Sequence, residues 1–227
     1  MTQQHDLFAD PNAVAVYAEG PARNVPGWAD MLRMTELLLA ERVPHHGRVL
    51  VVGAGGGLEL KRFAEMHAGW SFVGVDPAAE MLKLARSILG PLATRTQLHE
   101  GYVATAPAGP FDGATCLLTF HFVAPPERRT MLAEIRKRLR PSAPFVVAHL
   151  SFPQESIERR QWLERYAAFV VSSGVDPVKA RAGAEAVGSR LSILSPDQDE
   201  ALLRDAGFSN VQLFYAGFAF RGWVSQA

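Results

Sequence analysis

The chain has 227 residues, and its 23 Lys and Arg residues balance its 23 Asp and Glu residues to a formal net charge of zero. This balance excludes a strong overall positive field that would attract nucleic acid. A hydrophobic share of 48% excludes wholesale disorder, and the length suits one domain, 1–227, with room for an insertion.

The single cysteine, Cys116, excludes an internal disulfide and a cysteine-based zinc site, and we expect a buried core thiol. The His45-His46 pair has no further ligands near it in the sequence, so no metal is predicted. The N-terminus lacks a basic and an apolar signal region, and no apolar run approaches the roughly 20 residues that span a bilayer. We therefore expect a cytoplasmic protein that has no membrane partner.

Residues 1–28 form an N-terminal arm that is interrupted by proline and glycine and carries the aromatic residues Tyr17 and Trp28. Two interpretations stay open: the arm folds over a site as a lid, or it packs on the domain surface. Apolar residues at helical spacing then predict a helix over 29–42.

The run from Arg48 to Val52 has no polar alternation, which is typical of a strand buried on both faces of a parallel sheet. A glycine cluster, 53–57, follows at once and leads into a predicted helix that ends near His67. A strand, a glycine turn and a helix N-terminus together make a ligand cradle of main-chain N–H groups.

Alternation of strands and helices continues to residue 150. The predicted strands after the first are 70–75, 94–99, 114–120 and 145–150. The helix predicted over 126–139 carries a run of arginines between Arg128 and Arg140. We interpret this run as a solvated face, and the alternative is a surface that binds tRNA. Tyr102 lies in the loop after the third strand.

The alternation stops over about 151–195, where helices are predicted at 154–171 and 177–187, so we interpret this region as a helical insertion. A further helix begins after Ser195 as N-cap. Strands over 211–215 and 218–224, joined at Ala216-Gly217, should then pair antiparallel. The predicted fold is α/β: a Rossmann-like, doubly wound, seven-stranded mixed sheet whose last strand is antiparallel.

Asp76 ends the second strand about 20 residues after the glycines, the spacing of an acid that accepts hydrogen bonds from ribose hydroxyls. It also suits an N-cap of the next helix, and both roles can hold together. The two features predict a nucleoside ligand at the carboxyl ends of the strands.

The glycines fit the spacing Gly-x-Gly-x-Gly at Gly53, Gly55 and Gly57, whereas a dinucleotide fingerprint would need glycine at Leu58. In this the chain resembles the class I S-adenosylmethionine-dependent methyltransferases, which have a seven-stranded sheet with an antiparallel last strand. Phe72–Pro77, Leu139-Arg140-Pro141 and Asp205–Phe208 extend the resemblance over nearly the whole chain.

The resemblance implies S-adenosyl-L-methionine as cofactor and assigns residues to it. The implied cofactor-binding residues are Gly53, Ala54, Gly55, Gly57, Asp76, Pro77, Met81, Gly101, Tyr102, Leu117 and Leu118.

Two positions depart from the family. Tyr102 stands where many members have an acid near the adenine, and Val51 stands where many have an acid near the cofactor's amino group. A carbonyl of Leu117 or Leu118 would then take the second role.

A closer likeness is to the bacterial carboxy-S-adenosylmethionine synthases of tRNA wobble-uridine modification. Arg23–Trp28 and Phe122–Arg128 are similar to short segments of that family. Arg23 is the candidate substrate residue in this segment. Tyr17 and Trp28 are candidates to close over the cofactor or hold the acceptor, and the alternative is that these aromatic residues pack on the domain. The equivalent of the carboxylate-binding arginine stays open; Arg181 and Arg190 are examples of the arginines in the insertion.

His121 follows the fourth strand, where the resemblance places the transferable methyl group. It is the candidate general base, and the alternative is a histidine that lines the pocket or makes a structural hydrogen bond.

We predict a methyltransferase acting on a small-molecule acceptor. The alternatives are a carboxy-S-adenosylmethionine synthase-like enzyme with a role in tRNA modification, and a non-catalytic cofactor-binding module. A homodimer is compatible with the sequence.

Overall fold

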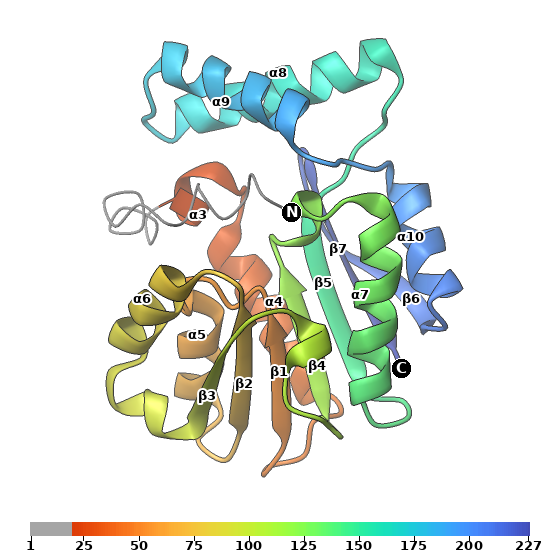
Figure 1. Ribbon diagram of the computed structural model, residues 1–227. Helices are drawn as coiled ribbons and strands as arrows, with labels where there is room; N and C mark the ends of the chain where they lie inside the picture. The colour runs from red at the N-terminus through yellow and green to blue at the C-terminus, as the bar shows by residue number, and fades with distance from the viewer. Residues whose placement is uncertain (1–19) are drawn as a thin grey trace.

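The computed structural model describes residues 20–227, so Tyr17 and most of the predicted N-terminal arm lie outside the described residues. Its central element is a seven-stranded sheet with strand order β3-β2-β1-β4-β5-β7-β6 (Figure 1). The strands are β1 Arg48–Val52, β2 Ser71–Asp76, β3 Thr96–Glu100, β4 Gly113–Leu117, β5 Pro144–Leu150, β6 Ser209–Gly217 and β7 Phe220–Gln226.

Helices join and cover these strands. They are α3 Gly20–Asn24, α4 Trp28–Ala40, α5 Leu58–Met66, α6 Ala79–Leu89, α7 Pro125–Arg138, α8 Ser156–Ser172, α9 Pro177–Arg190 and α10 Pro196–Asp205. Three 3-10 turns complete the chain: η1 Gly90–Arg95, η2 Val103–Thr105 and η3 Phe120–Phe122. In the described range no helix is long and apolar enough to cross a bilayer.

Strands β1 to β5 pair in parallel, and β7 lies antiparallel between β5 and β6, which confirms the predicted fold class. Successive residues of a strand point to opposite faces. Accordingly, Val49 and Val51 pack with α4, α5 and α6 on one face, while Leu50 and Val52 pack with α7 and α10 on the other. The first strand is therefore buried on both faces, as its unbroken apolar run predicts.

Two predicted boundaries were wrong. Gly217 pairs with Phe220, so the closing turn is Phe218-Ala219 instead of Ala216-Gly217, and Phe218 has a φ of 47°. Glycine favoured the earlier position, but strand pairing decides where the chain reverses. The fourth strand ends at Leu117 instead of Phe120, because Leu118, with a φ of 54°, leaves the extended conformation.

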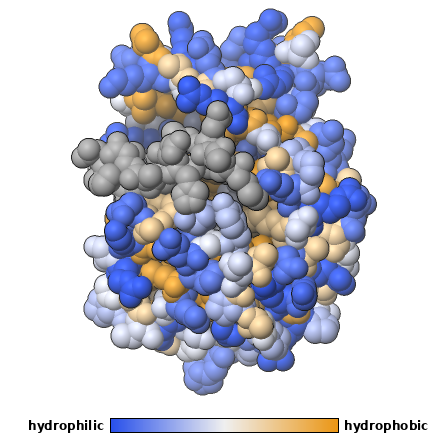
Figure 2. All heavy atoms as spheres, viewed as in Figure 1, coloured by the Kyte–Doolittle hydropathy of each residue, from blue (hydrophilic) through white to orange (hydrophobic). Residues whose placement is uncertain are grey.

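Helices α8 and α9 pack on each other beyond the carboxyl ends of the parallel strands (Figure 1). The pair packs against the cluster of buried residues near the ends of β4 and β5. Its partly buried apolar residues in this contact include Trp162, Leu163 and Val187. Figure 2 shows hydrophobic residues where this layer meets the rest of the molecule. That the pair is an insertion in one domain, 1–227, stays a prediction.

Candidate active site

The glycine loop between β1 and α5 has a backbone shape that side chains would disturb. Gly53, Gly55 and Gly57 have φ values of 71°, 47° and 77°, a region that glycine adopts without steric cost. A Cβ on Gly53 would lie 2.0 Å from the Thr119 hydroxyl oxygen, and one on Gly57 would lie 2.9 Å from Ala85. Close packing as well as turn geometry therefore requires glycine here.

Asp76 holds this loop through its carboxylate. One oxygen, Oδ2, accepts a hydrogen bond from the Gly55 N–H at 2.9 Å. The other, Oδ1, accepts one from the Ala78 N–H at 2.9 Å, just before α6 begins. The prediction of Asp76 as N-cap of this helix was wrong, because the N-cap is Ala78; Asp76 instead holds the turn that leads into the helix. A carboxylate oxygen can accept more than one hydrogen bond, so Asp76 suits a ligand that donates O–H groups.

A cavity of about 320 Å³ opens where β1, β2 and β4 end, at the edge where doubly wound sheets bind ligands. Nine of the eleven residues that the resemblance assigns to a cofactor line it. They are Gly53, Gly55, Asp76, Pro77, Met81, Gly101, Tyr102, Leu117 and Leu118. The structure therefore brings together residues from four separate parts of the sequence.

Several candidate residues do not line the cavity. Ala54 is buried, and Gly57 packs against Ala85 at the start of α5. Arg23 is exposed on α3, and Trp28, partly buried at the start of α4, packs against apolar residues next to Met31. Their predicted contacts with substrate remain predictions.

The cavity has a further wall, formed by α7 and the residues just before it, that was not predicted from the sequence. Four residues at helical spacing on α7, together with Phe122 and Val123 just before it, complete the lining; the four are Glu127, Thr130, Met131 and Glu134. The spacing i, i+3, i+4, i+7 puts them on one helix face, and this signal was available in the sequence. What the sequence does not show is that this face turns toward the glycine loop.

Every charged side chain that lines the cavity in residues 20–227 is acidic: Asp76, Glu127 and Glu134. Glu134 is paired with Arg138, and this hydrogen bond is the main cause that lowers the pKa of its carboxyl. Most of the remaining lining is apolar or glycine. An apolar cavity with acidic groups at its wall suits a ligand that carries positive charge.

His121 is buried and is not part of the cavity lining. Its Nδ1 accepts a hydrogen bond from the Leu150 N–H at 3.3 Å, and its carbonyl accepts one from Ser192. Burial is the main cause that lowers the pKa of His121 well below its ordinary value of 6.5, with charges on His149 and Arg128 adding to the effect. The ring is therefore neutral and structurally engaged, and its role as a base stays a prediction.

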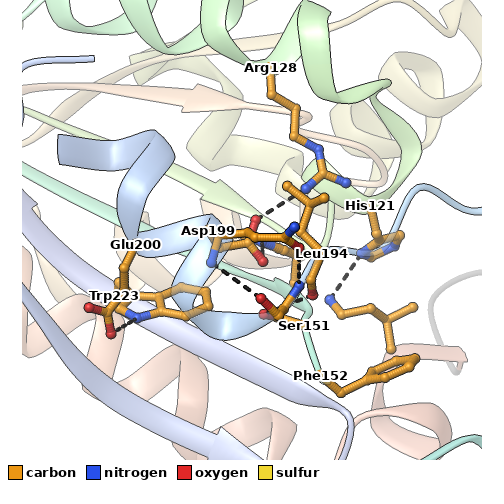
Figure 3. Close-up of polar contacts among 12 residues, drawn as sticks. His121, Arg128, Ser151, Phe152, Leu194, Asp199, Glu200 and Trp223 are labelled. Atoms are coloured by element: carbon orange, nitrogen blue, oxygen red, sulfur yellow. Dashed lines mark hydrogen bonds and ion pairs between the residues drawn. The ribbon is translucent and has the colours of Figure 1, made fainter. Parts of the chain in front are cut away.

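Arg128 links the wall of the cavity to the C-terminal part of the chain (Figure 3). Its Nε donates to the Val123 carbonyl at 2.9 Å, its Nη1 donates to Asp199 Oδ1 at 3.1 Å, and its Nη2 donates to the Ser192 carbonyl. Asp199 Oδ2 also lies 3.2 Å from Nε2 of His149 on β5. One buried guanidinium thus fixes the turn before α7 against α10 and β5.

The interpretation of the α7 arginines as a solvated face was wrong for two of them. Arg128 is only 1% exposed and Arg138 is 9% exposed. Arg138 donates to the Ala104 carbonyl of η2 as well as to Glu134. Charged side chains are buried only when they are paired, and the partners here come from distant parts of the sequence.

Cys116 is buried as a free thiol, as predicted.

In residues 20–227 no group of three or more His, Cys, Asp or Glu side chains could hold a metal ion.

The family model described as "Methyltransferase domain" matches residues 49–142, which run from β1 through the loop after α7. Residues 49–142 are thus similar to a methyltransferase domain. This domain contains the glycine loop, Asp76 and the α7 wall, so it includes all the described elements that line the cavity.

Relatives by sequence extend this similarity to nearly the full chain. The chain is 20% identical over 216 residues to the carboxy-S-adenosyl-L-methionine synthase of Campylobacter lari, covering 95% of this chain and 92% of that protein. It is 23% identical over 224 residues to the enzyme of that name from Dichelobacter nodosus, covering 97% and 92%. The resemblance to class I methyltransferases, with a closer likeness to the synthase branch, is confirmed.

Solved structures share the fold. An O-methyltransferase family protein from Burkholderia thailandensis has a TM-score of 0.72 at 14% identity, covering 99% of this chain and 62% of that chain. Human N-acetylserotonin methyltransferase in complex with SAM has a TM-score of 0.68 at 13% identity, covering 99% and 59%. The chain thus spans about three fifths of these two neighbours' length. A SAM-dependent methyltransferase from Aquifex aeolicus has a TM-score of 0.65 at 16% identity, covering 96% of this chain and 98% of that chain.

The family model agrees with the predicted enzyme class, a SAM-dependent methyltransferase, and solved neighbours in complex with SAM or SAH agree with the predicted cofactor, S-adenosylmethionine.

Arg128→Met should lower the free energy of unfolding by about 3 kcal/mol, because it leaves the buried Asp199 carboxylate without its cationic partner. Urea unfolding followed by circular dichroism measures the change. Arg129→Met is the matched control: the Arg129–Asp205 pair is solvent-exposed, and its loss should cost less than about 1 kcal/mol. Equal costs for the two variants would contradict the structural role of Arg128.

His121→Gln should reduce the loss of stability at acid pH. Below pH 6.5 the unfolded chain protonates His121 while the folded protein keeps it neutral, so the unfolded state binds more protons and the free energy of unfolding falls. Urea unfolding at pH 7.5 and 5.5 measures this difference, with the exposed His46→Gln as control. A fall in kcat of about 100-fold or more would instead support His121 as a base.

Proposed function

We propose that the protein transfers a methyl group from S-adenosylmethionine to a small-molecule acceptor. The observation that carries the proposal is the cavity itself. Glycine backbone, the Asp76 carboxylate and an acidic, otherwise mostly apolar wall meet at one sheet edge in a methyltransferase domain.

The residues present fit this cofactor. The carboxylate of Asp76 can accept hydrogen bonds from the two ribose hydroxyls while it keeps its bonds to Gly55 and Ala78. Pro77, Met81 and Tyr102 offer apolar surface for the adenine. Gly53 and Gly55 line the cavity and carry no side chain, so a ligand can approach their backbone.

When bound, S-adenosylmethionine supplies an activated methyl group, and the protein's contribution is to orient the reactants and exclude water. Leu117, Leu118 and Phe122 give the end of the cavity near β4 a low polarity, which strengthens the electrostatic effect of nearby charges. Thr119 keeps the loop in place by donating from its hydroxyl to the Leu117 carbonyl at 3.0 Å. We infer that transfer to an already nucleophilic acceptor needs no proton transfer to His121.

The acceptor would enter from the side of α3 and the α8–α9 layer. We infer that this layer covers the acceptor pocket, because it packs near the ends of β4 and β5, where the methyl group would lie. A covered pocket of this size favours a small molecule over a folded macromolecule.

A carboxy-S-adenosylmethionine synthase-like activity is the second candidate, and it is supported by relatives that bear this name over 95% of the chain. Such a cofactor carries an extra carboxylate, for which a basic partner is expected. The described lining of the cavity contains no Lys, Arg or His, and Arg181 and Arg190 are exposed on α9. The geometry therefore favours the first candidate.

Mass spectrometry of the nucleoside that copurifies with the protein tests both candidates. S-adenosylmethionine or S-adenosylhomocysteine supports methyl transfer, whereas a carboxylated cofactor supports the second candidate. Recovery of no nucleoside, together with no binding of S-adenosylmethionine by calorimetry, would refute both and favour a non-catalytic module.

Asp76→Ala should weaken S-adenosylmethionine binding by about 10-fold to 100-fold, because a charged acceptor is worth about 1.5–3 kcal/mol. Isothermal titration calorimetry measures the affinity, and thermal unfolding shows that the variant folds. Asp176→Ala is the matched control, since Asp176 also accepts from two backbone N–H groups but at the start of α9. Unchanged affinity in Asp76→Ala would mean that the ribose lies elsewhere.

A further inference from the structure

The adenine ring of S-adenosylmethionine carries a 6-amino group, and its N–H bonds need acceptors when the ring is buried. In the proposed site the ring lies beside Tyr102, which has no carboxylate to offer. The carbonyl of Tyr102 already accepts two hydrogen bonds from Thr105, one from the N–H and one from the hydroxyl, both at 3.0 Å. The carbonyls of Val103 and Ala104 also accept hydrogen bonds. The loop after β3 is therefore short of free acceptors for this group.

Glu134 of α7 is the acid that the structure brings to this loop. It lines the cavity together with Tyr102, Val103 and Ala104. Arg138, which is 9% exposed, links the two elements: its Nη1 donates to the Glu134 carboxylate, and its Nη2 donates to the Ala104 carbonyl at 2.9 Å. Because one guanidinium bonds to both, the carboxylate is held next to the loop that follows Tyr102.

The Glu134 carboxylate keeps one oxygen for a ligand. Its Oε2 bonds to Arg138, whereas its Oε1 lies 3.9 Å from the Nζ of Lys137, which is too far for a hydrogen bond. The side chain is 26% exposed, so it is partly shielded from water. The bond to Arg138 is the main cause that lowers the pKa of Glu134, so the carboxyl is ionised at neutral pH. An ionised oxygen in a fixed position is a strong acceptor of N–H bonds.

The other polar side chains on the α7 wall are less suited to this contact. Glu127 lies seven residues before Glu134, about 10 Å along the helix axis, and its N–H donates to the Ala124 carbonyl where the helix begins. It is thus at the opposite end of this helix face from Arg138. Thr130 lies between the two acids and offers a neutral hydroxyl, which is a weaker acceptor than a carboxylate. Glu134 is the acid of this wall that is tied to the adenine side of the cavity.

We propose that Glu134 makes the cavity selective for adenine, by accepting a hydrogen bond from the 6-amino group through its Oε1. Arg138 positions this carboxylate and does not contact the cofactor. The inference rests on the proposed cofactor site, within which it names the residue that sets the choice of base. A ligand without the amino group would leave the carboxylate both unpaired and shielded from water, which is the costly state for a charged acceptor.

Calorimetric titration of the full chain with S-adenosylhomocysteine and two of its analogues tests the selectivity. One analogue has purine in place of adenine, so it lacks the 6-amino group. The other has 7-deazaadenine, which keeps the amino group and changes the ring at position 7. We expect the affinity to fall about 10-fold to 100-fold for the purine analogue, because a charged acceptor loses its partner, and to change little for the 7-deaza analogue.

Glu134→Gln tests the residue itself. The glutamine oxygen must stay on Arg138, because an amide nitrogen cannot accept from a guanidinium, so the amide N–H groups would face the amino group of adenine. The variant should therefore bind S-adenosylhomocysteine about 10-fold more weakly or worse, and should bind it no better than the purine analogue. Thermal unfolding shows that it folds. Glu127→Gln is the matched variant on the same helix face, and it should keep the preference for the amino group.

Glu134→Asp is a second variant that keeps the charge beside Arg138. It withdraws the carboxylate from the cavity by one methylene, so it should also lose most of the preference, and it decides the question if Glu134→Gln does not fold.

Equal affinity of the parent protein for S-adenosylhomocysteine and its purine analogue overturns the proposal. A preference for the amino group that persists in the folded Glu134 variants, or that disappears in Glu127→Gln, also overturns it. Failure of S-adenosylhomocysteine to bind the parent protein is a different result, because it refutes the proposed cofactor site as a whole.

Discussion

The carboxylate of Asp76 joins three elements whose ends form the cavity. It accepts from Gly55 in the loop after β1 and from Ala78 before α6, while it belongs to β2 itself. The N–H groups of Gly53 and Ala54 donate to the Val75 carbonyl and continue the same bridge. Because backbone atoms make these bonds, the loop keeps its shape without side chains that would fill the space. One acid thus shapes the site and offers lone pairs to a ligand.

The α7 wall of the cavity is held in place by buried charged side chains. Arg128 holds the turn at Val123 and binds Asp199 on α10, so the start of α7 is tied to a segment more than seventy positions later. Removing a buried charge from water is costly, and the pair offsets this only because several acceptors surround the guanidinium. His121 lies between the same segments with a neutral ring. We infer that this polar cluster sets the position of Phe122 and Val123 at the cavity.

Charge also distinguishes this cavity from a general nucleotide site. A phosphate-binding loop gains from basic side chains, whereas the charged side chains lining this cavity in residues 20–227 are acidic. A cofactor that carries positive charge and no phosphate fits such a lining. Val51, where an acid would be expected from the resemblance, packs in the core instead. Glu59, in the first turn of α5, is a buried carboxyl.

The sequence by itself determined the order of strands and helices, the glycine loop and the place of Asp76, because each depends on local periodicity or on short spacing along the chain. The resemblance to a known family also identified nine residues that line the cavity. Tertiary structure alone decided the burial of Arg128 and His121, the turn at Phe218-Ala219, and the contribution of α7 to the cavity. These depend on which distant segments pack together, and local patterns cannot show whether a charged helix face meets solvent or a partner.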